Sequence, residues 1–169
     1  MISAAIRDPS ALRRAFSHHP TGVAALAATV DGDDQVLVAS SFMTGISVDP
    51  PLVSVAIQKS STTWSVLRRA SRIGVSLLGQ DQASLCRQLA SKEKQARWHG
   101  VMRDYTSAKA LRIHGASAWL ECAAFAEHEA GDHVIVLLEV KDFAVSHSID
   151  PLIFHCSRFR ELVPEVVSV

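Results

Sequence analysis

The sequence predicts a small β-barrel with short helices around it. Several apolar segments have strand character, and hairpin turns join four of these segments into two pairs. The segments lack the regular intervening helices that a doubly wound sheet needs. Closing such hairpins into a barrel removes unpaired strand edges. With 169 residues, 48% of them apolar, the chain can fill one core and has little length for a second. We therefore expect a single domain over residues 1–169.

The first half of the chain is expected to hold two helices and four strands. Asp8 and Pro9 form a helix start, and residues 20–22 end that helix. The Asp-Gly turn at residues 31–34 predicts a hairpin. Between the second and third strands, after Ser41, we expect a hydroxyl-rich loop that is stiffened by Pro50 and Pro51. The expected strands are 22–30, 35–41, 52–57 and 73–78, and the second helix is 60–70.

The second half is expected to be a helix followed by irregular chain and then strands. Residues 80–90 have the apolar spacing of an amphipathic helix, and residues 91–113 are charged and mixed, which predicts irregular structure. A turn at residues 129–132 separates two long strand patterns. The expected strands are 119–127, 133–145 and 151–156, and residues 159–169 are expected to be a tail.

Composition excludes several classes of protein. Seventeen basic and seventeen acidic residues cancel, so the basic excess of a nucleic-acid binder is missing. No apolar run approaches the roughly 20 residues of a membrane span, and the N-terminus lacks the pattern of a signal peptide. Three widely spaced cysteines are typical of a reducing compartment rather than a disulfide scaffold. We expect a cytoplasmic protein without nucleic-acid or membrane partners.

Residues 59–62 predict a phosphate site at a strand-to-helix junction. Lys59 supplies a full positive charge, and Ser60, Ser61 and Thr62 supply hydroxyl donors. A helix that begins here also leaves backbone N–H groups free and carries partial positive charge at this end. The alternative is a serine that only caps the helix beside a solvated lysine.

Small residues at the end of the preceding strand favour a planar ligand. Val38, Ala39, Ser40 and Ser41 allow a ring to lie against the backbone, whose N–H and C=O groups could bind the polar edge of an isoalloxazine. The alternative is an exposed loop that tolerates serine. Taken with the phosphate-type junction that follows, the pattern indicates a flavin site.

In these motifs the chain resembles the flavin reductase family, the reductase components of two-component flavin-dependent monooxygenases. The resemblance runs from about residue 16 to residue 162 and depends on the order and spacing of the motifs rather than on one of them. The motifs are Thr21-Gly22-Val23, Ser41-Phe42, residues 47–53, residues 59–64, Arg97-Trp98-His99-Gly100, Leu120-Glu121-Cys122, Gly131-Asp132-His133 and residues 151–154.

The resemblance implies a dimeric, six-stranded antiparallel FMN-binding split barrel. It implies that residues 38–41 line the isoalloxazine and that residues 59–62 hold the ribityl phosphate. Trp64 would pack behind them, and Arg97 would reach the flavin. The nicotinamide cofactor would involve Asp132 and His133, with Phe154 and Phe159 in the same pocket. Departures from the family pattern fall at Ser40, Ser76 and residues 155–158.

His133 has two interpretations. It could orient the nicotinamide or donate a proton near the flavin, because histidine titrates close to neutral pH, or it could only close a hairpin. The other histidines, among them His18, His19 and His128, form no ligand set of regular spacing, so no metal site is expected. Cys86 and Cys122 are expected in the core.

The leading hypothesis is an NAD(P)H:flavin oxidoreductase that passes hydride from NADH or NADPH to FMN or FAD. The cofactors carry the difficult chemistry, and the protein supplies alignment and electrostatics. The resemblance implies a homodimer and a monooxygenase that receives the reduced flavin. Two alternatives are a flavin carrier or regulatory module without reductase activity, and a split-barrel FMN enzyme that acts directly on an organic substrate.

Overall fold

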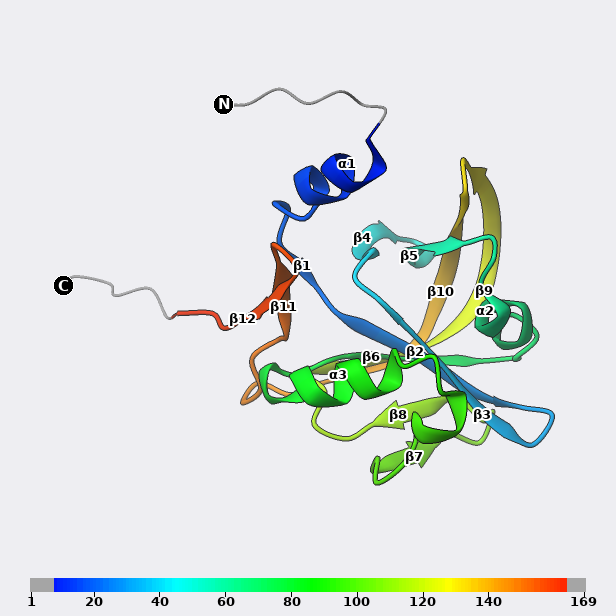
Figure 1. The fold of residues 1–169 in the computed structure, drawn as a ribbon. Helices are drawn as coiled ribbons and strands as arrows, with labels where there is room; N and C mark the ends of the chain where they lie inside the picture. The colour runs from blue at the N-terminus through cyan, green and yellow to red at the C-terminus, as the bar shows by residue number, and fades with distance from the viewer. Residues whose placement is uncertain (1–7, 164–169) are drawn as a thin grey trace.

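An antiparallel sheet of seven strands forms the body of the protein in the computed structural model, which describes residues 8–163 (Figure 1). Its strand order is β3-β2-β6-β9-β10-β5-β4. The strands are β2 (Ala24–Val30), β3 (Asp33–Ala39), β4 (Phe42–Val48), β5 (Pro51–Gln58), β6 (Ile73–Leu77), β9 (Ala118–Ala130) and β10 (His133–Val145). The end strands β3 and β4 follow each other in the chain, so the corner at Ser40 and Ser41 brings the two edges of the sheet together. The predicted mainly-β split barrel is confirmed, with seven strands in this sheet instead of six.

Two smaller sheets and several short helices surround the barrel. The three-stranded sheet has the order β1-β11-β12, and β7 pairs with β8. Figure 1 shows α1 beside the β11–β12 hairpin, on the opposite side of the molecule from the β2–β3 turn. The bounds are β1 (Thr21–Gly22), β7 (Arg103–Tyr105), β8 (Leu111–Ile113), β11 (Ile153–His155), β12 (Arg158–Arg160), α1 (Pro9–Phe16), α2 (Thr62–Leu67), α3 (Ala83–Leu89) and the 3₁₀ turns η1 (Gln80–Gln82) and η2 (Lys94–Ala96).

Local turn and capping signals determine both long hairpins and the first helix. Asp31 and Gly32 have φ values of 53° and 90° between the paired ends of β2 and β3, the conformation that Asp-Gly favours in two-residue hairpins. Gly131, with φ of 65°, lies in the turn between β9 and β10. The Asp8 carboxylate accepts a hydrogen bond of 2.9 Å from the Ser10 amide and caps α1. These elements were predicted correctly.

Three predicted segments were wrong. Residues 42–48 form β4, paired with β5, and not a loop. Residues 91–113 include η2, β7 and β8, and the side chains of Leu111 and Ile113 are buried. Part of the predicted tail belongs to β12, whereas residues 164–169 lie outside the described residues. Each of these strands has its partner far away in the chain or carries an exposed face, so local apolar spacing was a poor guide to it.

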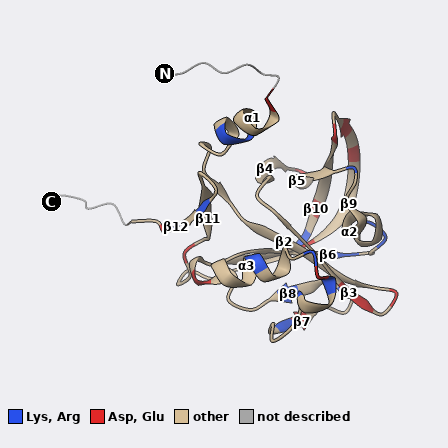
Figure 2. Cartoon of the chain, in the orientation of Figure 1, with Lys and Arg blue, Asp and Glu red and all other residues tan. Residues whose placement is uncertain are grey.

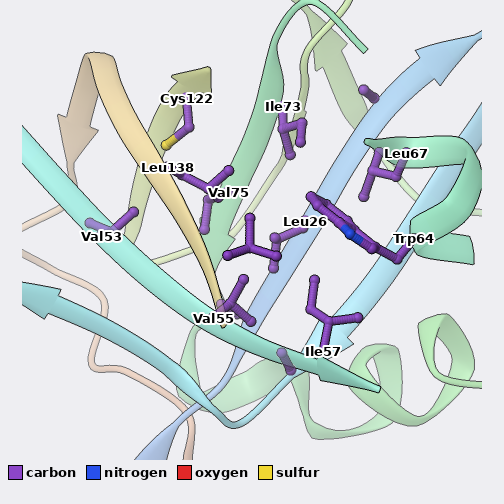
Figure 3. Packing of buried hydrophobic residues seen from close by; sticks show 14 residues of the cluster. Leu26, Val53, Val55, Ile57, Trp64, Leu67, Ile73, Val75, Cys122 and Leu138 are labelled. Carbon is purple, nitrogen blue, oxygen red and sulfur yellow. The ribbon is translucent and has the colours of Figure 1, made fainter. Parts of the chain in front are cut away.

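The inner faces of the barrel strands enclose the main core. Leu26 of β2, Val55 of β5 and Leu138 of β10 have no exposed surface, and Figure 3 shows such side chains pointing toward one another between the strands. Trp64 and Leu67 of α2 close one end of this cluster. Burying side chains of this size contributes about 1.5–3 kcal/mol each before entropy is counted, so α2 is held in place by packing more than by its six residues of helix.

A second cluster packs α3 and the 91–113 segment against the outside of β2 and β3. Leu89 of α3 and Leu111 of β8 are fully buried there, together with Cys86. Burial raises the pKa of the Cys86 thiol, and it raises the pKa of Cys122 in the main core to about 12. Both thiols are therefore core groups, as predicted. Within residues 8–163, no helix combines the length and the apolarity that crossing a membrane requires.

Candidate functional site

A cavity of about 460 Å³ lies where the barrel sheet is split, beside the end of β3. The carboxyl ends of β3 and β5, the start of α2, the end of α3 and the first residue of β10 surround it. It is lined by Val36, Leu37, Val38, Ala39, Ser40, Ser41, Ala56, Ile57, Gln58, Ser61, Thr63, Leu89, Ala90, Arg97 and His133. One open space therefore contacts five elements that are distant in the sequence.

Strand β3 gives the cavity a free backbone edge. It stands at the end of the strand order, and in the described part of the chain its ladder partner is β2, on one side. On the opposite edge the carbonyl oxygen of Val36 accepts a hydrogen bond from Arg97. Because alternate residues of a strand point their backbone groups to the same edge, Val38 also presents its N–H and C=O groups there. Backbone groups of this kind need a partner when water is excluded. This edge can bind a planar ligand that carries both donors and acceptors.

The corner between β3 and β4 is fixed by a side-chain hydrogen bond. Ser41 Oγ donates to the carbonyl oxygen of Ala56 in β5 at 2.7 Å. Ser40 is exposed beside it. The small side chains of Ala39, Ser40 and Ser41 leave the cavity mouth open because none of them extends beyond its γ atom. Residues 38–41, which were predicted to lie together at a ligand site, all line this cavity.

The start of α2 forms the polar end of the cavity. Ser61 is the N-cap, and its Oγ accepts a hydrogen bond of 3.1 Å from the Trp64 amide. The hydroxyl hydrogen of Ser61 stays available for donation to an acceptor, because capping uses only the oxygen lone pair. Ser61 thus caps α2, and this cap leaves its hydroxyl hydrogen free for a second role.

Lys59 was expected beside the start of α2, but Lys94 holds that position. The ammonium of Lys59 forms an ion pair with Glu129 of β9, close to the acidic end of the β9–β10 hairpin that Figure 2 shows in red. The ammonium of Lys94 in η2 instead donates to Thr62 Oγ1 at 3.1 Å. The cation beside the first residue of α2 is therefore Lys94, which sequence reasoning missed because it lies 32 positions away from Thr62.

Arg97 connects three elements at the wall of the cavity. Its Nε donates to the carbonyl oxygen of Ser91 at 2.7 Å, and its Nη1 donates to the carbonyl oxygen of Val36 at 3.0 Å and to Thr63 Oγ1 at 3.3 Å. Burial lowers the pKa of Arg97, yet a guanidinium remains charged in proteins. The structure therefore places a fixed positive charge between the free edge of β3 and the start of α2.

His133 lies at the rim of the cavity as the first residue of β10. Its Nδ1 is 2.7 Å from the Asp132 carboxylate, which fixes the orientation of the ring. The hydrogen bond and the charge of His133 hold the pKa of Asp132 below its ordinary value. Across the ladder, His133 is paired with Gln58 of β5. The imidazole is half-buried and within the cavity lining, so both of its predicted roles remain compatible with its position.

Some of the predicted site residues line the cavity and the others do not. Seven line the cavity, namely Val38, Ala39, Ser40, Ser41, Ser61, Arg97 and His133. Lys59, Ser60, Thr62 and Asp132 adjoin the lining residues in the chain without lining the cavity themselves. Trp64 is buried in the main core behind the start of α2. Phe154 and Phe159 pack on each other with ring centroids 5.5 Å apart, on the β11–β12 hairpin outside this cavity.

A second cavity of about 630 Å³ adjoins the first and shares Val36 and Arg97 with it. Its wall is held by Asp34, which accepts hydrogen bonds from Thr29 at 2.7 Å, Tyr105 at 2.7 Å and Arg103 at 2.9 Å. Burial raises the pKa of Asp34, but the three hydrogen bonds outweigh this effect and lower it below the ordinary value. This network anchors the segment that carries Arg97.

Several lining residues were not found from the sequence. Gln58 and Thr63 add an amide and a hydroxyl to the wall, and Leu89 and Ala90 close it from α3. Gln58 and Thr63 flank the predicted phosphate motif, so a wider window around that motif would have included them. The α3 residues carried no such signal, because their apolar spacing indicates only a packed helix face.

Comparisons with known proteins show which family this chain resembles over most of its length. The model of a family described as "Flavin reductase like domain" matches residues 16–163. A protein named flavin reductase from Pseudomonas putida is 33% identical over 149 residues, covering 88% of this chain and 86% of that protein. The reductase component of 4-hydroxyphenylacetate 3-monooxygenase from Thermus thermophilus is 29% identical, covering 90% of this chain and 96% of that protein.

Among solved structures, the NADH:FAD oxidoreductase of Streptomyces globisporus, in complex with NAD and FAD fragments, superposes with a TM-score of 0.92. It is 29% identical, and the match covers 98% of this chain and 99% of that one. The similarity thus extends over the barrel, the peripheral helices and the small β1-β11-β12 sheet rather than over the sheet alone.

Proposed function

This chain belongs to the flavin reductase-like family, and we propose that it is an NAD(P)H:flavin oxidoreductase that supplies reduced flavin to a monooxygenase. The observation that carries the proposal is the cavity at the split of the barrel, where the free edge of β3, the start of α2, Arg97 and His133 meet. The relatives named as flavin reductase and as a monooxygenase reductase component support the same activity.

The cavity has the chemistry that a flavin requires. Its floor is the free edge of β3, where the N–H and C=O groups of Val38 complement donors and acceptors along the polar side of an isoalloxazine. The hydroxyl of Ser61 lies at one end of the cavity, and the ammonium of Lys94 lies beside it at the start of α2. An anionic ribityl phosphate or diphosphate would be stabilised there. We assign residues 38–41 to the ring, and Ser61, Thr62 and Lys94 to the phosphate. Ser60 is adjacent to Ser61 in the chain and receives no separate role. Lys59 is assigned to the ion pair with Glu129 on the β9–β10 hairpin.

When bound, the flavin accepts the hydride and the nicotinamide cofactor donates it. The chain itself aligns the two, and alignment of this kind lowers a barrier because it replaces a bimolecular encounter by a fixed geometry. The guanidinium of Arg97 opposes negative charge that develops on the ring during reduction. His133, oriented by Asp132 through Nδ1, presents Nε2 as the nitrogen that can hydrogen-bond a ligand at the rim.

Separate observations support the proposed monooxygenase partner and the proposed homodimer. The monooxygenase follows from the relatives that are reductase components of such systems. The proposed homodimer is supported by apolar side chains that are exposed on three strands of the barrel sheet: Met43 on β4, Ile135 on β10 and Phe125 on β9. An exposed apolar patch of this kind marks an interaction surface. An Ile135→Glu variant should run as a monomer in sedimentation analysis, and an unchanged oligomer would argue against this surface.

The test of the activity is direct. NADH and NADPH oxidation is followed with saturating FMN, FAD or riboflavin, with and without oxygen, and the reduced flavin is measured anaerobically. We expect nicotinamide oxidation that depends on added flavin, with one flavin reduced per nicotinamide oxidised. Tight flavin binding without nicotinamide oxidation would instead identify a carrier module. Oxidation that requires an added organic substrate would identify a split-barrel enzyme acting directly on that substrate. We also place the enzyme in the cytoplasm, where its three free cysteines would stay reduced.

A further inference from the structure

Three metal-ligating side chains meet outside the cavity lining, where the loop after α1 approaches the β11–β12 hairpin. His18 follows α1, His155 is the last residue of β11, and Cys156 is the first residue of the β11–β12 turn. Cys156 Sγ lies 3.4 Å from His155 Nε2 and 3.7 Å from His18 Nδ1. One ligand atom from each residue falls within 4.8 Å of the other two. The sequence concealed this cluster, because 138 positions separate His18 from Cys156.

The backbone holds the two segments of the cluster together. The Cys156 amide donates to the carbonyl oxygen of Ser17 at 2.7 Å, so the loop after α1 is attached to the hairpin at the position of the thiol. Cys156 and Ser157 both have positive φ, 50° and 58°, between the paired residues His155 and Arg158. Asn-Gly is the usual pair in such a two-residue turn. Here the first turn position directs a thiol toward two imidazoles.

The spacing suits one tetrahedral metal ion. With metal–nitrogen bonds of about 2.0–2.1 Å and metal–sulfur bonds of about 2.3 Å, neighbouring ligand atoms of a tetrahedral zinc site lie roughly 3.3–3.6 Å apart. The two measured sulfur–nitrogen distances are close to this range, and the exposed His18 can approach His155 by a change of side-chain rotamer. One thiolate and two imidazoles are ligands that Zn²⁺ prefers over Ca²⁺ or Mg²⁺.

We propose that His18, His155 and Cys156 form a Zn²⁺ site with a fourth position open to water. On binding, the Cys156 thiol loses its proton to solvent and its sulfur forms the bond to zinc, without any change of oxidation state. The ion joins the loop after α1 to the β11–β12 hairpin. This hairpin carries Phe154 and Phe159 and pairs with β1, so the metal stabilises the position of the N-terminal helix.

The experiment titrates the full-length protein, freed of metal with a chelator, with Zn²⁺ in competition with a chromogenic chelator. Co²⁺ serves as the spectroscopic probe, because a thiolate ligand adds a near-ultraviolet charge-transfer band and a tetrahedral site gives intense visible bands. We expect one Zn²⁺ per chain. Cys156→Ser and His18→Gln should each weaken the affinity at least about 100-fold, since loss of a direct ligand exceeds the 10–100-fold typical of changes to groups that only orient the ligands.

His19→Gln is the matched control, because His19 is the next histidine in the same loop and is not part of the cluster. It should bind Zn²⁺ within about threefold of the wild type. Thermal melts without metal verify that the variants fold, and added Zn²⁺ should raise Tm in the wild type and in His19→Gln but not in Cys156→Ser. The proposal is overturned if the wild type binds no stoichiometric Zn²⁺, if Cys156→Ser binds it equally well, or if the Co²⁺ complex lacks the thiolate band.

Discussion

Replacing Arg97 is the most direct test of the candidate flavin site. Its guanidinium donates hydrogen bonds to carbonyl oxygens of residues 91 and 36 and to the Thr63 hydroxyl, and it lines the cavity. These contacts give Arg97 two separable effects. One is on the stability of the protein without ligand, through the segment that it anchors. The other is on the affinity for flavin, through its charge and remaining N–H donors.

The two effects have different expected sizes. In Arg97→Met the carbonyl oxygens lose a donor that is only partly replaced by water, which should lower the free energy of unfolding by about 1–3 kcal/mol. One charge-assisted hydrogen bond to flavin contributes about 1.5–3 kcal/mol, so the Kd for FMN should rise roughly 10- to 150-fold. Arg97→Lys keeps the charge but lacks the planar fork, and its Kd should fall between those of the wild type and Arg97→Met.

Fluorescence titrations with FMN and riboflavin measure affinity, and urea unfolding without ligand measures stability. An equal loss of affinity for both flavins would assign Arg97 to the ring, whereas a loss for FMN alone would assign it to the phosphate. The reasoning is refuted if Arg97→Met remains folded and binds both flavins within about twofold of the wild type.

Three further predictions follow from the same geometry. A Cβ on Gly74 would lie 2.0 Å from a backbone oxygen of β8, so Gly74→Ala should lower the free energy of unfolding by about 1–3 kcal/mol or more, whereas Gly22→Ala, which meets nothing within 4 Å, should change it by less than about 0.5 kcal/mol; urea unfolding measures both. Burial opposes ionisation of Asp34, but hydrogen bonds, including that from Arg103, lower its pKa in the folded protein. The contribution of Asp34 to stability should therefore be full above the unfolded pKa of about 3.9 and be lost as pH falls through the lower folded value. The free energy of unfolding, measured as a function of pH, should therefore fall more steeply at acid pH in the wild type than in Asp34→Asn. His133→Gln should lower the turnover number about 10-fold or more with a nearly unchanged Kd for flavin if the imidazole acts on the bound pair, and unchanged steady-state and stopped-flow rates would restrict His133 to closing the hairpin.

Local signals made most of the barrel predictable. The Asp31-Gly32 turn and the Gly131 turn each determine a hairpin within a few residues. The register of β2–β3 follows from its turn, whereas that of β9–β10 follows only as far as Leu137, where the first of two shifts begins. Strand β4 was missed because its face is exposed and rich in hydroxyls, so burial did not impose an alternating pattern on it. Its place is determined by pairing with β5, which is a tertiary property. Strand β8 was missed because it has only three residues, too few for its alternation of buried and exposed side chains to be recognised.

The candidate site shows the same division. Residues 38–41, Ser61, Arg97 and His133 meet at one cavity as the motifs indicated, because each stands at the end of a strand or helix that the barrel directs to the same side. Sequence could not decide which lysine lies beside α2. Lys59 precedes the helix, yet Glu129 on the neighbouring hairpin binds it, and Lys94 reaches Thr62 from a segment that seemed irregular. Such choices depend on partners that only the folded chain brings close.

The position of the cavity at the split of the sheet explains how the same site could bind flavin and also release it. A closed barrel would pair both edges of β3, but here the corner at Ser40 and Ser41 turns the chain into β4 before a ladder closes. Flavin would complete hydrogen bonds that the sheet leaves open, mostly with backbone groups and few side chains. Backbone hydrogen bonds contribute about 0.5–1.5 kcal/mol net each, so such a site binds firmly without burying the ligand in the core. That balance suits a protein whose product must leave for a partner, and it makes the charges at the phosphate end, more than the ring contacts, the determinant of how long flavin stays.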